Sequence, residues 1–324
     1  MPQNDPDALL ATLIHISDTH FGSQFTTEEG TWKKLTTLRG LQVHSYQVAR
    51  SLAIRVKQIF SDREDIRIPV CVVFTGDLTS SGKEDEFLVG STFLRGEHWL
   101  GAGDKVGLGL GPICTAMSVD SPPTLFSIPG NHDIWQRNNP KVMDIYKDNF
   151  PFSYPNVLEI KTTKCPIVIY GLDSTLNTKL RHRFARGRVP PGQLESLEKK
   201  LQDGLRNKVI QVVCVHHPLI DPEGKSSKLT MQLDKRGIIA RRLLEAGAHL
   251  VLSGHLHEYS TAQAKPGVLP AHVIIGTATQ QFEKRSFCVF DVYQSRIEGT
   301  VFHFDPTVCQ FKPDLSAKQV FPVS

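Results

Sequence analysis

Short apolar runs, rich in β-branched residues, recur along the chain with helical patterns between them. Runs of this length that are bounded by turn residues predict buried strands, and apolar residues at helical spacing predict amphipathic helices. The predicted strands cover residues 11–16, 68–75, 124–128, 167–172, 209–215, 249–253 and 273–276. The predicted helices cover residues 48–59, 194–205 and 234–246, and a further helix is expected to begin at residues 139–140. A strand followed by a helix, repeated along a chain, indicates a layered α/β fold.

The pattern changes after the seventh run. Two strand-like runs at residues 287–293 and 297–304 are separated by a short polar turn, which predicts an antiparallel ending and a mixed sheet. A length of 324 residues suits two domains or one large α/β domain. We expect a single domain over residues 1–304, with a glycine-rich inserted loop at residues 96–111. Residues 305–324 contain three prolines and little periodicity, and we expect them to form a tail that lies on the surface or touches a partner.

Composition restricts the class of protein. With 40% hydrophobic and 22% charged residues, the chain is neither disordered nor collagen-like. The net charge of +4 identifies no partner. No stretch approaches the roughly 20 apolar residues that span a bilayer, and the first residues lack a basic segment followed by an apolar run. We therefore expect a soluble protein with no membrane span and no export signal.

The six cysteines are far apart and form no CxxC pair. Several lie inside predicted strands, where a free thiol packs as a small hydrophobic group. Buried free thiols fit a reducing compartment, so we expect a cytoplasmic protein. A disulfide between two of these scattered cysteines is the alternative.

Side chains that can bind metals follow five of the predicted strands. The carboxyl ends of strands line the ligand crevice of an open α/β sheet, so residues far apart in the sequence are expected to meet there. The residues at these ends are Asp18 and His20, Asp77, Asn131 with His132 and Asp133, His216 and His217, and His255 and His257. A lone buried histidine is more often a hydrogen-bonded core residue than a ligand. The ordered series at strand ends favours one shared site over that alternative.

The donor types at these ends predict a metal site. Carboxylate, amide and imidazole donors without thiolate suit Mn, Fe, Co or Zn better than a cysteine-type structural zinc or a calcium ion. The candidate ligands are Asp18, His20, Asp77, Asn131, His216, His255 and His257. Seven ligands exceed what one tetrahedral ion uses, whereas two ions about 3.5–4 Å apart with a bridging carboxylate would use all of them. Such a pair of ions clamps a phosphoryl group.

Five motifs occur in a fixed order along the chain: Asp18-x-His20, Gly76-Asp77, Gly130-Asn131-His132-Asp133, His216 and Gly254-His255-x-His257. This series resembles the calcineurin-like metallophosphoesterase superfamily, from residue 12 to about residue 260. The resemblance implies a four-layer α/β/β/α sandwich of mixed sheets around a dinuclear centre, and from the donor types we expect its two ions to be Mn, Fe or Zn. It also implies that the chain hydrolyses phosphate esters.

The resemblance assigns a role to each position of the series. The residues implied for one ion are Asp18, His20 and His257, and those implied for the other are Asn131, His216 and His255. Asp77 would bridge the two ions, His132 would face the leaving group, and Asp133 would orient His132. Asp133 has a second interpretation, as a turn or helix-cap residue.

Within the superfamily, three features look like the class III cyclic-nucleotide phosphodiesterase and glycerophosphodiesterase group. They are the His-His-Pro sequence at residues 216–218, the strand end at residues 170–174 and the segment at residues 187–205. Long spacers at residues 21–68 and 80–123 depart from that group. Such insertions could rebuild the substrate pocket, so the substrates of the group do not transfer directly to this chain.

Several residues outside the series are candidates for substrate contact. Arg181 and Arg183 belong to a dense basic cluster that would either guide an anionic substrate or form a solvated face. A run of charges is usually a solvated face, so nucleic acid is not favoured as a partner. His217 would either contact phosphate or pack before the following proline. Trp99 and Trp135, in or beside expected rim loops, would either pack there or stack on a base.

The combined interpretation is a metal-dependent phosphodiesterase that acts on a small phosphate ester. A hydroxide bridging the two ions would attack phosphorus in line, and His132 would assist the departing oxygen. The alternatives are a phosphomonoesterase or protein phosphatase, a nuclease, and a non-catalytic scaffold that has kept the fold. A scaffold is expected to lack ligands or the leaving-group histidine, and here every position is filled. The oligomeric state is left open.

Overall fold

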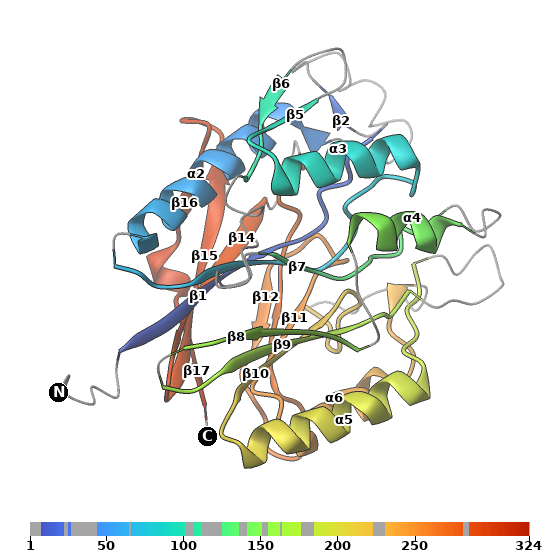
Figure 1. Cartoon of the computed structure of the whole chain (residues 1–324), viewed down its shortest axis with the longest axis vertical. Coiled ribbons are helices and arrows are strands. Elements are labelled where there is room, and N and C mark those ends of the chain that lie inside the picture. Colours follow the sequence, from blue (N-terminus) through green and yellow to red (C-terminus); the bar gives the residue numbers. More distant parts are fainter. Residues whose placement is uncertain are drawn as a thin grey trace.

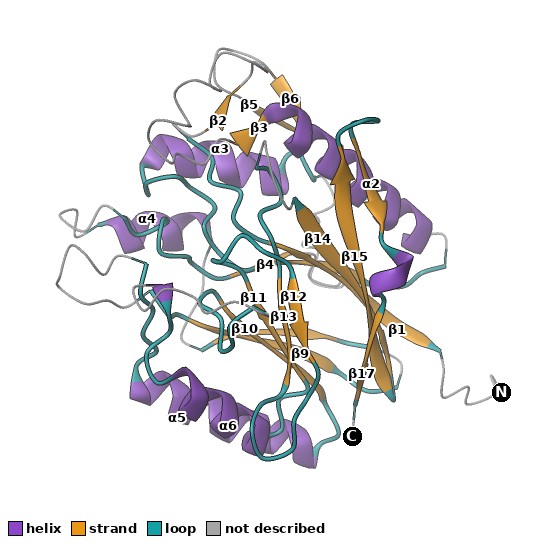
Figure 2. Cartoon of the chain, turned by 180° about the vertical axis from the view of Figure 1, so that it is seen from behind, coloured by secondary structure: helices purple, strands orange, loops and turns teal. Residues whose placement is uncertain are grey.

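Two β-sheets lie face to face in the centre of the molecule, and helices cover their outer faces (Figure 1). The layers run helix, sheet, sheet, helix, and Figure 2 shows the same arrangement from behind. This is the predicted α/β/β/α sandwich of mixed sheets. The computed structural model describes residues 8–22, 25–26, 44–64, 66–100, 106–111, 125–135, 141–150, 155–162, 164–175, 185–222, 231–280 and 285–323.

The first sheet joins strands from both ends of the chain. Its strands are β1 (Leu9–Ile16), β4 (Val70–Phe74), β7 (Leu125–Ser127), β14 (Ser286–Tyr293), β15 (Arg296–Asp305), β16 (Gln310–Pro313) and β17 (Gln319–Pro322). Their order is β16-β15-β14-β1-β4-β7, and β17 also pairs with β15. β1, β4 and β7 are parallel, whereas the C-terminal strands pair in antiparallel fashion. The parallel half therefore places three carboxyl ends at one edge.

The second sheet has a parallel centre and antiparallel edges. Its strands are β8 (Asn156–Ile160), β9 (Ile167–Leu172), β10 (Ile210–Val215), β11 (Leu250–Ser253), β12 (Ser260–Ala262) and β13 (Ala271–Ile274). Their order is β12-β13-β11-β10-β9-β8, and only β8 and β12 run antiparallel to their neighbours. Two short pairs lie outside both sheets: β2 (Phe25–Thr26) with β3 (His44–Ser45), and β5 (His98–Leu100) with β6 (Val106–Leu108).

The helices divide between the two outer faces. They are α2 (Tyr46–Glu64), α3 (Glu84–Arg95) and α4 (Val142–Asn149) on the side of the first sheet, and α5 (Pro191–Arg206) and α6 (Arg236–Ala246) on the side of the second (Figure 1). Val48, Leu52 and Val56 of α2 pack in one buried cluster with Ile14 and Ile16 of β1. The four-residue spacing that predicts α2 is thus the spacing of its buried face.

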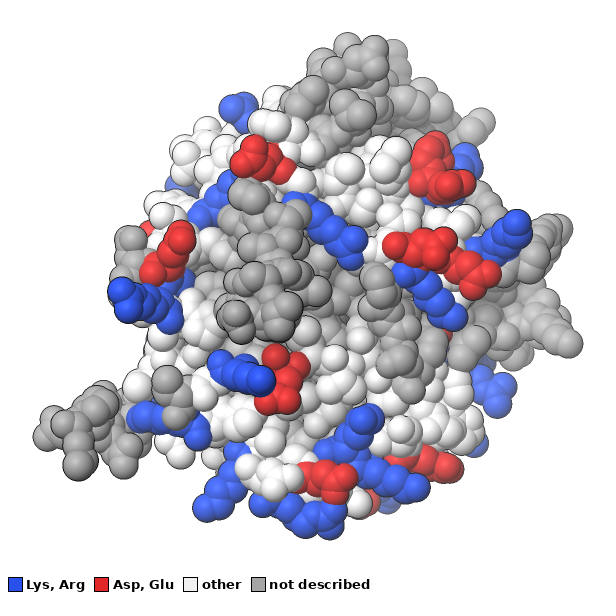
Figure 3. Space-filling model, viewed as in Figure 1, with Lys and Arg blue, Asp and Glu red and all other residues white. Residues whose placement is uncertain are grey.

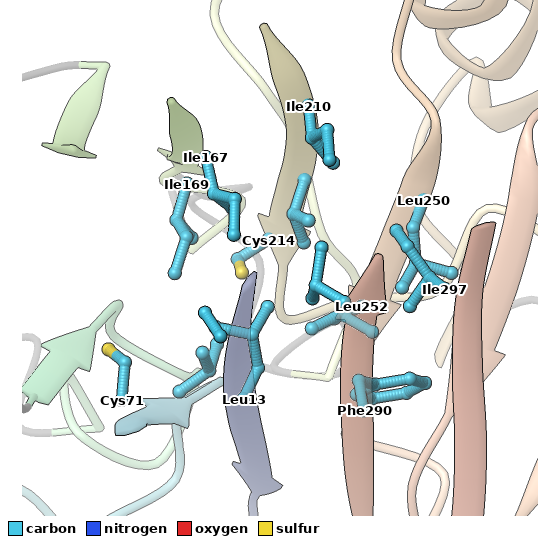
Figure 4. Packing of buried hydrophobic residues seen from close by; sticks show 14 of the residues in the cluster. Leu13, Cys71, Ile167, Ile169, Ile210, Cys214, Leu250, Leu252, Phe290 and Ile297 are labelled. Carbon is cyan, nitrogen blue, oxygen red and sulfur yellow. The ribbon is translucent and has the colours of Figure 1, made fainter. Parts of the chain in front are cut away.

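The apolar core between the sheets holds them together. Figure 4 shows Leu13 and Phe290 of the first sheet in one cluster with Cys214 and Leu252 of the second. Side chains alternate between the two faces of a strand, so the neighbours of Leu13 in β1 point to the helices instead. Because both faces of the central strands are covered, these strands appear in the sequence as continuous apolar runs.

Most predicted elements are present. Each of the nine predicted strands coincides with an observed strand, and the predicted helices coincide with α2, α5 and α6. The start predicted at Asn139 and Pro140 lies outside the described residues, and α4 begins at Val142. The sequence reasoning missed α3 and the edge strands β8 and β12. The two edge strands have five and three residues and are only partly buried, so they lack a continuous apolar run.

The C-terminal residues are not a tail, contrary to the prediction. Residues 310–313 and 319–322 form β16 and β17, which add to the first sheet along β15. Phe311 and Phe321 are buried and anchor these segments. The prolines 313 and 322 stand at the ends of outer strands, where a missing amide costs little. Proline content therefore misled the prediction.

The predicted inserted loop contains the short β5 and β6 pair, and its residues 101–105 lie outside the described residues. Leu110 at the end of this segment is buried. Five cysteines are described and form no disulfide with one another: Cys71, Cys165, Cys214 and Cys288 are buried as predicted, whereas Cys309 is exposed and Cys114 lies outside the described residues. Among the described residues, no helix has the length and apolar character needed to cross a membrane.

Candidate metal centre

Five loops carry the predicted ligands to one place. Each loop follows the carboxyl end of a strand: β1, β4 and β7 in the first sheet, and β10 and β11 in the second. Six of the seven predicted ligands are buried, and His257 is partly buried. The amide of His255 donates hydrogen bonds to the carboxylate of Asp18, although 237 residues separate the two in the sequence. The strand ends therefore converge, as the sequence reasoning expected.

The backbone is in an uncommon conformation at most of these residues. Asp18, His20, Asp77, His255 and His257 have φ values between 46° and 72°. This left-handed region is rarely adopted by residues other than glycine, and it costs on the order of 1–3 kcal/mol for each of them. Such strain persists where the surrounding structure imposes it, and it concentrates at functional sites.

Two glycines allow the loops to approach the carboxylates. A Cβ atom on Gly130 would lie 2.2 Å from Oδ1 of Asp77, and a Cβ atom on Gly254 would lie 2.3 Å from Oδ2 of Asp18. Both distances are far shorter than the non-bonded contacts that Cβ atoms make with oxygen in proteins. The glycines that precede the ligands in the sequence motifs are therefore required by close packing, at these two positions at least.

The first ligand group contains Asp18, His20, Asp77 and His257. Each offers one ligand atom, and these atoms all lie within 4.8 Å of one another. Nε2 of His20 lies 3.1 Å from Nε2 of His257 and 3.7 Å from Oδ2 of Asp77. Nε2 of His257 in turn lies 3.2 Å from Oδ1 of Asp18. The four side chains thus face a common point.

The second ligand group contains Asp77, His216 and His255, whose ligand atoms also lie within 4.8 Å of one another. Nε2 of His216 lies 3.3 Å from Oδ2 of Asp77 and 3.1 Å from Oδ1 of Asn131. Asn131 therefore belongs beside this group. Asp77 is a member of both groups, in the position of a bridging carboxylate.

Backbone carbonyls orient the two histidines of the second group. Nδ1 of His216 lies 2.8 Å from the carbonyl oxygen of Thr75, and Nε2 of His255 lies 3.1 Å from that of Met231. A carbonyl only accepts, so each of these ring nitrogens carries the proton. The other nitrogen of each ring, Nε2 of His216 and Nδ1 of His255, is then available as a ligand.

The electrostatics of the cluster favour a cation. Burial opposes the ionisation of Asp18 and Asp77, but His257 beside the first and His216 beside the second hold the pKa of each carboxyl below its usual value. Burial lowers the pKa of His20 well below its usual value and that of His255 to about 3. Burial also opposes the charge of His216, yet Asp77 raises its pKa to about 9. Two buried carboxylates among mainly neutral imidazoles attract positive charge.

Two metal ions fit this donor set. Carboxylate, imidazole and amide donors without thiolate suit Mn, Fe or Zn. The Nε2 atoms of His20 and His257 lie 3.1 Å apart and can share a hydrogen bond, and in the tautomers with Nε2 unprotonated both would turn a lone pair toward a cation. The side-chain nitrogen of Asn131 is buried and lacks a hydrogen-bond partner among the described residues, as expected if its oxygen faces an ion. Six of the seven predicted ligands therefore form two adjoining groups that could each hold a metal ion, and Asn131 lies beside the second group.

His132 lies beside the first group. Its ring meets the ring of His20 edge-on, with centroids 4.5 Å apart, and its backbone amide donates to Oδ1 of Asp77 over 2.8 Å. Nδ1 of His132 lies 2.8 Å from the carbonyl oxygen of Ser80, which fixes the proton on Nδ1 in the neutral ring. His132 is thus next to the ligands without being one of them.

Asp133 does not orient His132, contrary to the role implied by the resemblance. Its Oδ1 accepts from the amide and hydroxyl of Thr79, and its Oδ2 accepts from the amide of Gly130. The carbonyl of Ser80 orients His132 instead. Asp133 is buried, and burial, followed by the charge of Asp77, raises its pKa to about 7. It ties two ligand loops together, which matches its alternative interpretation as a turn residue.

The predicted substrate contacts have mixed outcomes. His217 is buried against the second group, with its ring centroid 4.4 Å from that of His255 and its Nδ1 2.7 Å from Oγ of Ser174. A Cβ atom on Gly187 would lie 2.4 Å from Cγ of His217, so the ring is tightly enclosed. Arg181 and Arg183 lie outside the described residues.

The sequence reasoning missed His44, which lies beside the first group. Its ring centroid is 4.9 Å from that of His20, and its Nδ1 lies 2.7 Å from Oγ1 of Thr279. His44 belongs to the two-residue strand β3, far from the end of any predicted strand. No periodicity or motif in the sequence marks it.

Comparison with known proteins extends these observations. A family model described as calcineurin-like phosphoesterase matches residues 11–259. No curated protein matches the sequence significantly. A dimetal phosphatase from Danio rerio shares the fold, with a TM-score of 0.57 and 12% identity over 98% of this chain and 100% of that chain. GAP50, described as the anchor in the inner membrane complex of Plasmodium, has a TM-score of 0.57 and 11% identity over 98% of this chain and 90% of that chain.

Proposed function

The chain belongs to the calcineurin-like phosphoesterase family, and from that premise we propose that it is a phosphodiesterase acting on a small, singly charged phosphate diester. The family uses a dimetal centre to hydrolyse phosphate esters. The observation that carries the proposal is the position of Asp77, whose carboxylate belongs to both ligand groups. One carboxylate shared between two sites is what a pair of adjacent ions requires.

The chain's own residues define where two ions would be held. The residues expected around one ion are Asp18, His20 and His257, and those around the other are Asn131, His216 and His255, with Asp77 between them. Bound ions would supply Lewis acidity toward the phosphoryl oxygens and would lower the pKa of water toward neutrality. The buried, strained loops hold the ligands in place before substrate arrives, so little reorganisation is needed at the moment of reaction.

His132 is proposed to serve the leaving group. With Nδ1–H donated to the carbonyl of Ser80, the remaining nitrogen is Nε2, which in the protonated ring would give its proton to the departing oxygen and leave the ring neutral. The ring touches His20, so it lies at the edge of the first ligand group. A residue in this position contributes to turnover without contributing to metal binding.

The charges around the cluster support a diester over a monoester. Besides burial, the groups with the strongest influence on the pKa of Asp18 and of Asp77 are histidines, together with Asp77 in the case of Asp18, and no lysine or arginine is among them. Once the ions replace the proton of His216, positive charge at the described part of the centre would therefore come from the ions. Near neutral pH a phosphate diester carries one negative charge and a phosphate monoester carries two. A diester therefore needs less positive charge at the site to bind.

The charges on the face shown in Figure 3 favour a small substrate over nucleic acid. On the face shown in Figure 3, lysine and arginine side chains lie among aspartate and glutamate side chains, and they are more frequent along the lower edge over α5 and α6. Nucleic-acid binding requires a continuous basic surface that neutralises several phosphates. The mixed charges on this face do not provide one.

Hydrolysis of a substrate panel tests the proposal. The panel contains bis-p-nitrophenyl phosphate, p-nitrophenyl phosphate, a cyclic nucleotide, a glycerophosphodiester and a short DNA, each measured with Mn and after chelation. We expect diesters to exceed the monoester in kcat/KM and chelation to abolish all turnover. A monoester preference of tenfold or more would indicate a phosphomonoesterase or protein phosphatase, and a DNA preference would indicate a nuclease. Turnover that survives chelation would contradict a dimetal mechanism.

A further inference from the structure

Trp135 is an exposed aromatic side chain beside the candidate metal centre. Its exposed fraction is 38%, and it is the one aromatic residue among the exposed large hydrophobic side chains in the described part of the chain. Tryptophan is highly buried on average, because its large ring removes much apolar surface from water. An exposed indole three residues after a proposed leaving-group histidine therefore has a position that suits contact with a ligand.

A row of rings connects Trp135 to the ligands. The indole stacks on the imidazole of His132, with ring centroids 4.4 Å apart and an angle of 28° between the planes. His132 meets His20 at 4.5 Å, and His20 lies 5.0 Å from His257. A leaving group that departs past His132 therefore moves away from the buried cluster in the direction of the exposed indole.

The stacked pair is fixed before any ligand binds. The backbone amide of Trp135 donates to the carbonyl of His132 over 3.1 Å, which closes a turn between the two residues. The ring of His132 is in turn held by the carbonyl of Ser80. A preformed aromatic surface loses little conformational freedom when a second ring packs against it.

We infer that Trp135 forms a subsite for a planar ring in the leaving group, so that the preferred diesters release a nucleoside or an aryl alcohol. This inference rests on the proposed phosphodiesterase function. Stacking of a base on an aromatic side chain strengthens binding by about 5- to 150-fold. An alternative role, in which Trp135 only holds His132 in place, predicts equal effects on every substrate.

Three diesters with the same methyl group and different leaving groups separate these roles. The leaving groups are a nucleoside, p-nitrophenol and glycerol, and the enzymes are the Mn-loaded wild type, Trp135→Ala, Trp135→Phe and, as a matched control at an exposed site on α5, Leu205→Ala. Each substrate is compared with itself between enzymes, so the intrinsic reactivity of the leaving groups cancels. Melting temperature and metal content confirm that each variant is folded and loaded.

We expect Trp135→Ala to lower kcat/KM about tenfold for the ringed leaving groups, mainly through KM, and at most about twofold for glycerol. Trp135→Phe should keep most of the preference, and Leu205→Ala should match the wild type. A loss confined to the nucleoside or to p-nitrophenol identifies which ring the subsite takes. Equal losses on all three substrates, or no loss on either ringed substrate, would overturn the inference.

A binding measurement keeps the subsite separate from the proposed activity. Wild type and Trp135→Ala are titrated calorimetrically with a nucleoside monophosphate, p-nitrophenyl phosphate and glycerol phosphate in the presence of Mn. We expect the variant to bind one or both ringed phosphates about tenfold more weakly and glycerol phosphate equally well. Failure of wild-type diester turnover with this binding difference intact would reject the proposed function and retain the ring subsite. Equal weakening for all three ligands would reject the subsite.

Discussion

The two ligand groups of the candidate metal centre share Asp77 but differ in how their histidines are held. In the second group, His216 and His255 each donate a ring N–H to a backbone carbonyl. In the first group, Nδ1 of His20 and Nδ1 of His257 have no hydrogen-bond partner among the described residues. The His257 side chain is also 12% exposed, whereas that of His216 is fully buried.

This difference indicates that the second group is a preorganised ion site and that the first group is an adaptable one. Hydrogen bonds to the far nitrogen of a ligating histidine fix its ring and typically change metal affinity by about 10- to 100-fold. We therefore expect the ion at His216 and His255 to bind more tightly than the ion at His20 and His257. The adaptable group also adjoins His132, so in the proposed mechanism leaving-group departure and ion exchange would occur on the same side.

The largest expected effect comes from the residue that the two groups share. Asp77→Asn removes charge from both ion sites, so we expect kcat/KM to fall by about 10⁴-fold, more than the 10²–10³ lost with a single electrostatic donor. The measurement is diester hydrolysis together with metal content. Asp291→Asn, which breaks a distant ion pair with Arg63, is the control and should keep activity near the wild-type level. Normal metal content in Asp77→Asn would show that the two groups do not depend on this carboxylate.

A smaller effect is expected at His132, which touches the first group without belonging to it. His132→Ala should keep both ions and lose about 10²- to 10³-fold in kcat, because the departing oxygen loses its proton donor. Steady-state kinetics and elemental analysis of the same preparation check this. Unchanged turnover would remove His132 from the mechanism, and loss of an ion would make it part of the first group.

A chelator titration compares the two groups directly. We expect two phases of metal release, separated by about 10- to 100-fold in affinity. His257→Ala should abolish the weaker phase and leave the tighter one, whereas His216→Ala should do the reverse. A single phase in the wild type, or loss of the tighter phase in His257→Ala, would contradict the proposed difference between the groups.

The smallest effects are expected from glycines that pack against one group each. In Gly254→Ala the new Cβ meets Asp18, and in Gly187→Ala it meets the ring of His217, which packs on His255. Overpacking of this kind costs about 1–3 kcal/mol of stability. We expect each substitution to lower the metal affinity of only the group that it touches, by at most about tenfold, and so to shift only one phase of metal release. Equal weakening of both phases by either variant would show that the groups respond as one unit.

Much of the fold follows from the sequence because the central strands are buried on both faces. β1, β4, β9 and β10 are continuous apolar runs, and such runs are visible without any structure. The edge strands depend on pairing with a neighbour and carry no such signal. β16 and β17 were mistaken for a tail because each holds only one buried aromatic residue, Phe311 or Phe321, beside its prolines. Long-range pairing, unlike periodicity, cannot be read from a short segment.

The candidate site likewise has a part that the sequence predicts and a part that it does not. The seven predicted ligands follow strands that the sequence marks, so their convergence could be expected from topology. The hydrogen bonds of Asp133 and His132 could not be predicted, because they are made with Thr79 and Ser80 in the loop after β4. His44 escaped notice because tertiary packing alone brings it to His20. Motif spacing therefore locates ligands, whereas the groups that orient them require the folded chain.

The number of ions bound to each chain tests the central claim most directly. The wild-type protein is loaded with Mn, freed of excess metal and measured by elemental analysis, beside Asp77→Asn and His257→Ala. Two equivalents in the wild type, about one in His257→Ala and fewer than one in Asp77→Asn are the predicted results. At most one equivalent in the fully loaded wild type would contradict the account of two ion sites that share Asp77.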